Sequence, residues 1–232
     1  MAKGFPSMWT TYFRGMDARL DPALKIAEFL LQIKAVKLSP NKPFTWASGW
    51  KSPIYCDNRK TLSYPAIRTY IRQQFVHVIN HEFGRPDIIA GVATGGIAHG
   101  ALVAHDLGLP FVYVRSSAKE HGMKNQVEGD LTTGRSVVVV EDLVSTGTSS
   151  LNAVQALREA GCEVKGMVSI FTYGFDEAVK RFEQEKVKLR SLTNYSLLLD
   201  QAMHDNYITE KDLLSLNEWR KDPSIWGKAV NA

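Results

Sequence analysis

The stretch from Val137 to Ser150 reads VVVVEDLVSTGTSS, and it decides the fold class of this chain. Four consecutive valines are apolar toward both faces, which is typical of a central strand in a parallel sheet covered on both sides. Two carboxylates, Glu141 and Asp142, follow at the carboxyl end of that strand. Small hydroxyl residues around Gly147 then lead into a helix predicted over residues 149–160.

Strands and helices alternate along the chain on either side of this stretch. Strands are predicted at residues 54–57, 87–92, 111–114, 137–140, 164–171 and 187–192. Helices are predicted at residues 22–36, 64–83, 149–160 and 209–221, and between the loop at 93–96 and Leu107, with Thr209 as the N-cap of the last one. This alternation predicts an α/β fold with a doubly wound, parallel sheet.

The chain is predicted to hold one domain over residues 21–232. Residues 1–20 have mixed composition and no clear period, so they are predicted to form an N-terminal extension outside it. Residues 116–134 are polar, carry three glycines and show no period, which predicts a long, mobile loop.

Ligands of doubly wound sheets bind at the carboxyl ends of the strands, which singles out the loops at 93–96 and 141–149. In the second loop, backbone N–H groups around a glycine and the following helix N-terminus favour a phosphate. Ionised Glu141 and Asp142 suit ribose hydroxyls, so one loop can hold a ribose and its 5-phosphate. The loop at 93–96 either cradles a second phosphate or simply connects strand and helix. The chain has neither a Walker GK[ST] triplet nor a GxGxxG fingerprint there.

Composition excludes several functional classes. No apolar stretch reaches the roughly 20 residues that a membrane span needs, and the first residues lack the apolar core of a secretory signal. The formal net charge is +4, but lysines and arginines are scattered rather than gathered in a nucleic-acid-binding run. Cys56 and Cys162 have no metal-ligand or disulfide spacing. We therefore expect a cytoplasmic protein that binds neither membrane nor nucleic acid.

The string EDLVSTGTS resembles the ribose-phosphate-binding signature of the type I phosphoribosyltransferases. Three further strings resemble the bacterial orotate phosphoribosyltransferases in the same order: residues 44–65 (FTWASGWKSPIYCDNRKTLSYP), 91–122 (GVATGGIAHGALVAHDLGLPFVYVRSSAKEHG) and 161–174 (GCEVKGMVSIFTYG). The resemblance runs from about Ile26 to the C-terminal WRKDP. It implies the type I fold, with a central mostly parallel sheet flanked by helices, a small N-terminal hood or flap over the base site, and a long mobile catalytic loop.

The resemblance also implies a reaction. Such an enzyme transfers ribose 5-phosphate from phosphoribosyl pyrophosphate to N1 of orotate, in the biosynthesis of UMP, and releases pyrophosphate. Mg²⁺ is held mainly by substrate oxygens, without a dedicated set of protein ligands. The family acts as a homodimer whose catalytic loop closes over the neighbouring subunit's site. It also has a cis peptide bond that corresponds to Ala93–Thr94 here.

Residue roles follow from matching this sequence to the family motifs. The implied catalytic residues are Lys119, His121, Glu141 and Asp142. The implied contacts to phosphoribosyl pyrophosphate are Arg115, Lys119, His121, Glu141, Asp142, Leu143, Val144, Ser145, Thr146, Gly147, Thr148 and Ser149. The implied contacts to orotate are Ser145, Tyr55 and Lys51.

Three positions depart from some relatives. Ala47 and Tyr173 stand where those relatives have a lysine and an arginine on the base side, so Arg59 or Lys51 must be considered for the orotate carboxylate. Gly95 stands where others have a lysine near pyrophosphate. Two alternative functions stay open: transfer to another base, and a non-catalytic regulator that senses phosphoribosyl pyrophosphate. The histidines His77, His81, His99, His105 and His204 are interpreted as surface or helix-lining residues.

Overall fold

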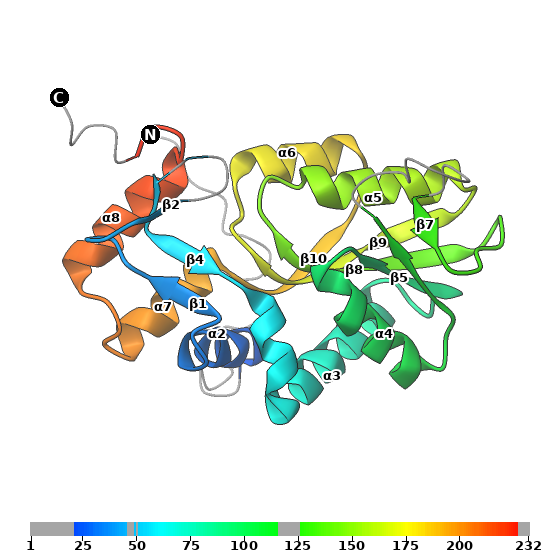
Figure 1. Cartoon of the computed structure of the whole chain (residues 1–232), viewed down its shortest axis with the longest axis horizontal. Coiled ribbons are helices and arrows are strands. Elements are labelled where there is room, and N and C mark those ends of the chain that lie inside the picture. The colour runs from blue at the N-terminus through cyan, green and yellow to red at the C-terminus, as the bar shows by residue number, and fades with distance from the viewer. Residues whose placement is uncertain (1–20, 46–48, 50, 116–125, 227–232) are drawn as a thin grey trace.

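The structure, a computed structural model, describes residues 21–45, 49, 51–115 and 126–226. A central sheet runs through the molecule, with helices on both faces (Figure 1). Residues 1–20, which were predicted to form an extension, lie outside the described residues. So do residues 116–125, which make up much of the predicted mobile loop.

The central sheet has six strands in the order β10-β9-β8-β5-β6-β7. The strands are β5 (Ile88–Val92), β6 (Phe111–Val114), β7 (Val127–Glu128), β8 (Ser136–Val144), β9 (Glu163–Thr172) and β10 (Leu189–Asn194). All neighbours are parallel except β6 and β7. The predicted doubly wound, mostly parallel sheet is confirmed.

Seven α-helices are found among the described residues. They are α2 (Pro22–Gln32), α3 (Pro65–Glu82), α4 (Gly95–Leu107), α5 (Thr148–Glu159), α6 (Asp176–Gln184), α7 (Tyr195–His204) and α8 (Glu210–Lys221). Thr209 caps α8 as predicted, and a capping box with Asp212 satisfies backbone N–H groups at both positions. Helices α6 and α7 were not predicted from the sequence.

The valine run of β8 is buried on both faces of the sheet. Val138 and Val140 pack into a core with residues of α2, α3, α4, α7 and α8. Val137 and Val139 pack into a second core with residues of α5 and with Phe182 of α6. In Figure 1, α5 and α6 accordingly lie on one side of the sheet, and α3 and α4 on the other.

The strand order reverses between β5 and β8. From β5 the chain passes through α4 to β6 on one side, and it later returns to place β8 on the other side of β5. Because α4 and α5 pack on opposite faces, the loops that follow β5 and β8 diverge at this point. A crevice beyond the carboxyl ends of two such strands is the usual ligand site of open α/β sheets.

Strand β8 is longer than predicted. It was expected to end at Val140, where its pairing with β5 ends at Gly91. On its other side β9 continues as a partner, so β8 runs on to Val144, which pairs with Thr172. Glu141 and Asp142 therefore belong to the strand rather than to the loop.

A second correction concerns the predicted loop at 116–134. Residues Val127–Glu128 form strand β7, antiparallel to β6. The backbone N–H of Arg115 donates to the carbonyl of Gln126 over 2.9 Å, and Val127 is buried. A two-residue strand with one apolar residue leaves no detectable period in the sequence, which is why it was missed.

The residues before the central sheet form a small hood. The first helix ends at Gln32, not at Val36 as predicted, because Lys34 takes a positive φ of 54°. Strand β1 (Val36–Leu38) then pairs with β4 (Ile54–Cys56), and β2 (Phe44–Thr45) pairs with β3 (Lys51–Ser52). Strand β4 leads into the 3₁₀ helix η2 (Asn58–Ser63). Over the described part of the chain, no helix has both the length and the apolar character to cross a membrane.

Candidate active site

The carboxylate of Asp142 lies at the point where the strand order reverses. A Cβ on Gly95, the first residue of α4, would overlap that carboxylate, so a side chain at this position would require the carboxylate to shift. A Cβ on Gly96 would overlap the carbonyl oxygen of Val140. The two glycines thus let the N-terminus of α4, with its partial positive charge, approach the end of β8 closely.

Glu141 occupies a different environment from its neighbour. Its side chain is buried, and its carboxylate accepts hydrogen bonds from the Ser150 hydroxyl (3.0 Å) and from the backbone N–H of Asp142 (3.0 Å). Burial, and then the charge of Asp142, raise the pKa of Glu141 well above its ordinary value. Both predicted acids thus reach the same strand end, but Glu141 is turned inward, under α5.

The signature turn leads directly into α5. Gly147 takes a φ of 81°, which favours glycine, and a Cβ there would also press on the ring of Phe182 in α6. The hydroxyl oxygens of Thr146 and Thr148 lie 3.3 Å apart beside the N-terminus of α5. Hydroxyl groups and free N–H groups at a helix N-terminus are suited to a phosphate.

Arg181 was not predicted as a site residue, although it reaches this turn. Its guanidinium donates to the Thr148 hydroxyl (2.5 Å) and pairs with Glu177 one turn earlier on α6 (2.6 Å). Sequence spacing gives no signal for this contact, because Arg181 lies 33 residues beyond Thr148. It adds a positive charge next to the predicted phosphate loop.

Arg115 is the only one of the three predicted loop cations that lies in the described residues; Lys119 and His121 are outside them. The guanidinium of Arg115 lies 3.6 Å from the carboxylate of Glu128 on β7. The predicted roles of these three residues stay predictions.

On the base side, the predicted residues belong to the hood. The ring of Tyr55 is 39% exposed and lies 5.7 Å from the ring of Phe44, centroid to centroid. Lys51 is exposed and donates to the Thr45 hydroxyl. An aromatic face with open surface is available there for a planar ring.

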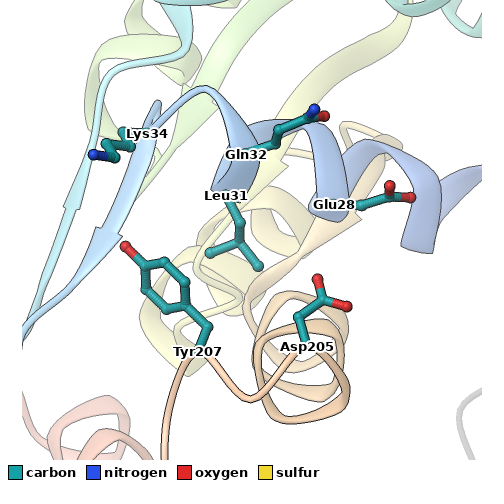
Figure 2. A pocket seen from close by; sticks show the side chains of 6 residues that line it. All are labelled: Glu28, Leu31, Gln32, Lys34, Asp205 and Tyr207. Carbon is teal, nitrogen blue, oxygen red and sulfur yellow. The ribbon is translucent and has the colours of Figure 1, made fainter.

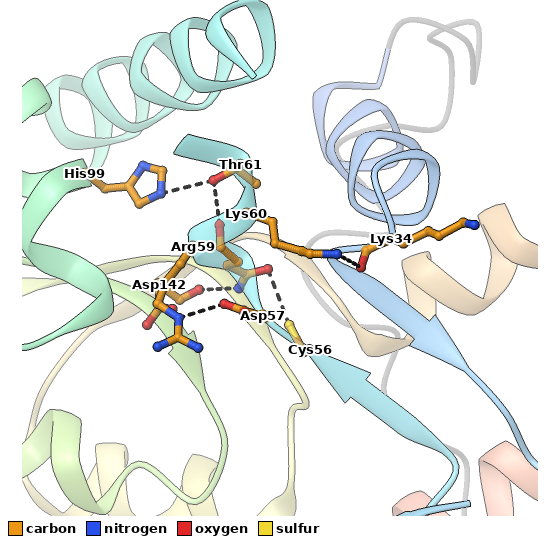
Figure 3. A network of polar contacts seen from close by, with 9 residues as sticks. Lys34, Cys56, Asp57, Arg59, Lys60, Thr61, His99 and Asp142 are labelled. Atoms are coloured by element: carbon orange, nitrogen blue, oxygen red, sulfur yellow. Dashed lines mark hydrogen bonds and ion pairs between the residues drawn. The ribbon is translucent and has the colours of Figure 1, made fainter. Parts of the chain in front are cut away.

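Arg59, on η2, is drawn with Asp57 and Asp142 in Figure 3. Its Nε donates to the carboxylate of Asp57 over 2.7 Å, and the side chain is 60% exposed. The hydrogen bond and charge of Asp57, with a smaller contribution from Asp142, raise the pKa of Arg59. Arg59 and Lys51 are the two candidates for binding the orotate carboxylate. Of these, Arg59 interacts electrostatically with Asp142.

Tyr173, which replaces an arginine of some relatives, is a core residue here. Its ring is stacked on Phe175, at 5.3 Å and 9°, and meets Trp219 edge-on at 5.7 Å. The guanidinium of Arg220 donates to the carbonyls of Tyr173 and Gly174. The end of β9 is therefore closed by aromatic packing and by α8. Ala47, the other departure, lies outside the described residues.

The peptide bond between Ala93 and Thr94, in the loop between β5 and α4, is cis, which confirms the prediction.

A separate hollow of about 300 Å³ lies between α2 and the end of α7 (Figure 2). It is lined by Glu28, Leu31, Gln32, Lys34, Asp205 and Tyr207. None of these was predicted as a site residue, so this hollow is not the candidate active site.

The expected magnesium ion would use few protein ligands at this site. In the described ranges, no three or more His, Cys, Asp or Glu side chains are grouped to hold a metal ion. Mg²⁺ typically keeps several waters and binds through one or two carboxylates together with substrate phosphates. Asp142 is a carboxylate of this kind.

Comparison with known proteins decides the family. A family model described as phosphoribosyl transferase domain matches residues 62–197. The orotate phosphoribosyltransferase of Bacteroides fragilis is 60% identical over 200 residues, which cover 86% of this chain and 94% of that protein. The chain belongs to the orotate phosphoribosyltransferase family. The resemblance of the four sequence strings is thereby confirmed.

Other members of the orotate phosphoribosyltransferase family agree. The protein of Listeria innocua is 56% identical over 204 residues, which cover 88% of this chain and 98% of that protein. Among solved structures, the orotate phosphoribosyltransferase from Aeropyrum pernix matches with a TM-score of 0.69 and 31% identity, over 77% of this chain and 98% of that one. The family fold therefore covers most of this chain.

Proposed function

We propose that this chain transfers ribose 5-phosphate from phosphoribosyl pyrophosphate to N1 of orotate, giving orotidine 5′-monophosphate and pyrophosphate. One observation carries the proposal: the carboxylate of Asp142 lies against the N-terminus of α4, and the signature turn joins it to the N-terminus of α5. Two positive helix ends flank one carboxylate. The sequence of helix end, carboxylate and helix end suits a ligand with a phosphate group at each end and ribose hydroxyls between them.

Catalysis then depends on positioning and electrostatics. Breaking the bond between C1 and pyrophosphate leaves positive charge on the ribose ring, which the Asp142 carboxylate stabilises while it holds the hydroxyls. Buried Glu141 supports it from behind by accepting the backbone N–H of Asp142. The turn from Ser145 to Ser149 holds the 5-phosphate. Lys119 and His121 neutralise the departing pyrophosphate, together with Arg115, which must exchange its partner Glu128 for the ligand. Bound Mg²⁺ supplies further charge neutralisation at the pyrophosphate.

Orotate binds on the hood side of Asp142. The ring of Tyr55 offers a partly exposed aromatic face, and Ser145 offers a hydroxyl and a backbone N–H. Arg59 neutralises the orotate carboxylate, in place of the basic side chains that Ala47 and Tyr173 replace, and Lys51 assists from β3. The proposal includes a cytoplasmic location, which the free thiols of Cys56 and Cys162 fit.

Release of pyrophosphate in the presence of both substrates tests this function. Orotate should support turnover, and uracil, adenine, guanine and hypoxanthine should not. Asp142→Asn should lower turnover by roughly 10²–10³-fold, as is typical when one charged group of a site is lost, with an unchanged melting temperature. Turnover with a different base would indicate another transferase. Tight binding of the ribose donor without turnover would indicate a sensor instead.

A homodimer with shared loops is part of the proposal, and mixing inactive variants tests it. Lys119→Ala and Asp142→Asn chains should each be nearly inactive alone. In a mixed dimer one site then collects both defects and the other collects neither. Equal amounts that re-pair randomly should recover about a quarter of wild-type activity, because half of the dimers are mixed and each has one intact site. Absence of recovery after proven subunit exchange would show that each loop serves its own chain.

A further inference from the structure

A chain of buried hydrogen bonds joins the hood to Asp142 (Figure 3). Three polar side chains in it are buried: Asn58 and Thr61 of η2, and His99 of α4. Buried polar groups are costly unless they are paired, so such a chain fixes its members in one arrangement. None of these three residues was predicted to have a role in the site.

The side chain of Asn58 has two partners. Its amide Nδ2 donates to the main-chain carbonyl of Asp142 over 2.7 Å, and its Oδ1 accepts from the thiol of Cys56 over 3.3 Å. Burial, then the charges of Asp142 and Asp57, raise the pKa of the Cys56 thiol, so the thiol stays protonated and can donate. The two contacts fix which end of the Asn58 amide faces Asp142.

The carbonyl of Asp142 lies beyond the reach of strand β5. Pairing between β5 and β8 ends with Gly91 and Val140, two residues before Asp142. The next partner on this side is the Asn58 amide, which comes from 84 residues earlier in the chain. The backbone N–H of Asp142 is bound to the Glu141 carboxylate. Both polar groups of the Asp142 backbone are thereby held.

The main chain of Asn58 is held in turn from α4. The hydroxyl of Thr61 donates to the carbonyl of Asn58 over 2.6 Å, and its oxygen lies 3.2 Å from Nε2 of His99. Because the Thr61 hydrogen is used, His99 must donate through Nε2–H. The Nδ1 atom of His99 is then the bare nitrogen of a neutral ring, and it is buried without a partner in the described structure. This chain links η2 to the helix that begins at Gly95.

We propose that Asn58 is a positioning residue, which holds the backbone of Asp142 so that its carboxylate meets the ribose in the geometry of the transition state. The inference rests on the proposed function, because it assigns Asp142 to the ribose. Asn58 itself touches no substrate in this account. Its loss should therefore lower kcat more than it raises the KM for phosphoribosyl pyrophosphate.

Asn58→Leu is the first test, because it keeps the size of the side chain and removes its donor. We expect kcat to fall at least tenfold, with less than a threefold change in KM. Ser136→Ala is the matched control, since it removes hydrogen bonds to Asp87 at the opposite end of the same strand. It should lower the melting temperature without lowering kcat. A folded Asn58→Leu enzyme with wild-type kcat would overturn the proposal.

Asn58→Asp gives a second test with the same shape. A protonated aspartic acid can donate to the carbonyl of Asp142, whereas an ionised one repels it. The titratable groups linked to this position are the Cys56 thiol, Asp142 through its carbonyl and His99 through Thr61, and Asp57 and Arg59 are its neighbours in the chain. Burial and nearby carboxylates raise the pKa of a carboxyl at this position. Lowering the pH then increases the fraction of the variant in the protonated, donating form.

The ratio of the kcat of Asn58→Asp to that of the wild type should therefore rise as the pH is lowered from 9 to 5. A constant or falling ratio would contradict the positioning role, even if Asn58→Leu fails to fold. Wild-type turnover of orotate, measured in the same experiment, separates failure of the proposed function from failure of the role of Asn58. An inactive wild type refutes the proposed function, whereas an active wild type with unaffected variants refutes only the role of Asn58.

Discussion

Gly95 and Asp142 share one space: the carboxylate of Asp142 lies where a side chain at position 95 would begin. Gly95 starts α4 with ordinary helical backbone, so its missing Cβ, rather than a special φ, is what the site requires. In this chain, the absence of a side chain at Gly95 lets the N-terminus of α4 approach the Asp142 carboxylate closely.

Gly95→Ala should therefore impair catalysis without unfolding the protein. The added methyl group displaces the Asp142 carboxylate or moves the start of α4, and either shift spoils the contact to ribose. We expect kcat/KM to fall about 10- to 100-fold, since small misplacements in a site are costly. Ala101→Ser, on an exposed position of the same helix, should have wild-type kinetics. Equal kinetics for both variants would refute the shared-space argument.

Glu141 predicts a pH dependence of stability. Its pKa in the folded protein lies well above the ordinary value of 4.5, because of burial and then the charge of Asp142. The unfolded chain then releases a proton that the folded chain keeps. The contribution of Glu141 to stability should accordingly fall as pH rises from 4.5 through the folded pKa.

Glu141→Gln removes this titration while it keeps the hydrogen-bonding shape. Urea unfolding at several pH values should show a smaller loss of stability with rising pH in the variant than in the wild type. Asp176→Asn, at the exposed start of α6, is a control that should keep the wild-type slope. Parallel curves for wild type and Glu141→Gln would show that Glu141 is ionised in the folded protein.

Buried His99 should make the opposite contribution to the pH dependence of stability, because it favours the folded state less as pH falls. Burial, and then the charge of Arg68, lower the pKa of His99 to about 4 from the ordinary value of 6.5. The unfolded chain therefore binds a proton at this histidine that the folded chain does not bind, and the contribution of His99 to stability should fall as pH drops from 6.5 toward 4. The linkage relation gives a loss of about 2 kcal/mol between pH 7 and pH 5.

His99→Gln, which cannot take up this proton, should lose less stability over the same interval. The measurement is urea unfolding at pH 7 and pH 5, compared through the change with pH rather than through absolute stability. His204→Gln, at an exposed histidine, serves as the control. If His99→Gln keeps the full wild-type loss, another group is responsible for it.

Arg181 predicts a contribution to substrate binding. Its guanidinium contacts Thr148 beside the proposed 5-phosphate site. Removing it should raise the KM for phosphoribosyl pyrophosphate roughly fivefold, which corresponds to about 1 kcal/mol. The value of kcat should change little, because the 5-phosphate is bound equally before and during the reaction. Arg181→Ala is compared with Lys180→Ala, the exposed neighbour on α6. Equal KM values for the two variants would exclude a role for Arg181.

Local patterns were sufficient to predict five of the six strands of the sheet. The valine run of β8 and the small residues of the signature turn each carry their signal within a few positions, and both were found where expected. Helix α7 had a comparable signal that was not used: Asn194 caps it by accepting from the N–H of Leu197. Helix α6 had another, with Asp176 and Glu177 in its first turn.

Long-range contacts could not be predicted in this way. The bond from Asn58 to Asp142 joins positions 84 residues apart, and nothing near Asn58 distinguishes it from an ordinary turn residue. The contact between Arg181 and Thr148 is equally invisible, because it depends on how α6 packs against Gly147. The inward turn of Glu141 depends on Ser150 and on burial, neither of which the acidic pair reveals.

The central place of β8 also constrains how the protein folds during synthesis. When the ribosome has released the chain only as far as Val144, β8 has β5 as a neighbour but lacks β9. The pairing that carries β8 past Val140 requires residues up to Thr172. The substrate site is therefore completed late, after the two halves of the sheet have met, and a nascent chain stalled before Thr172 should have no functional ribose site.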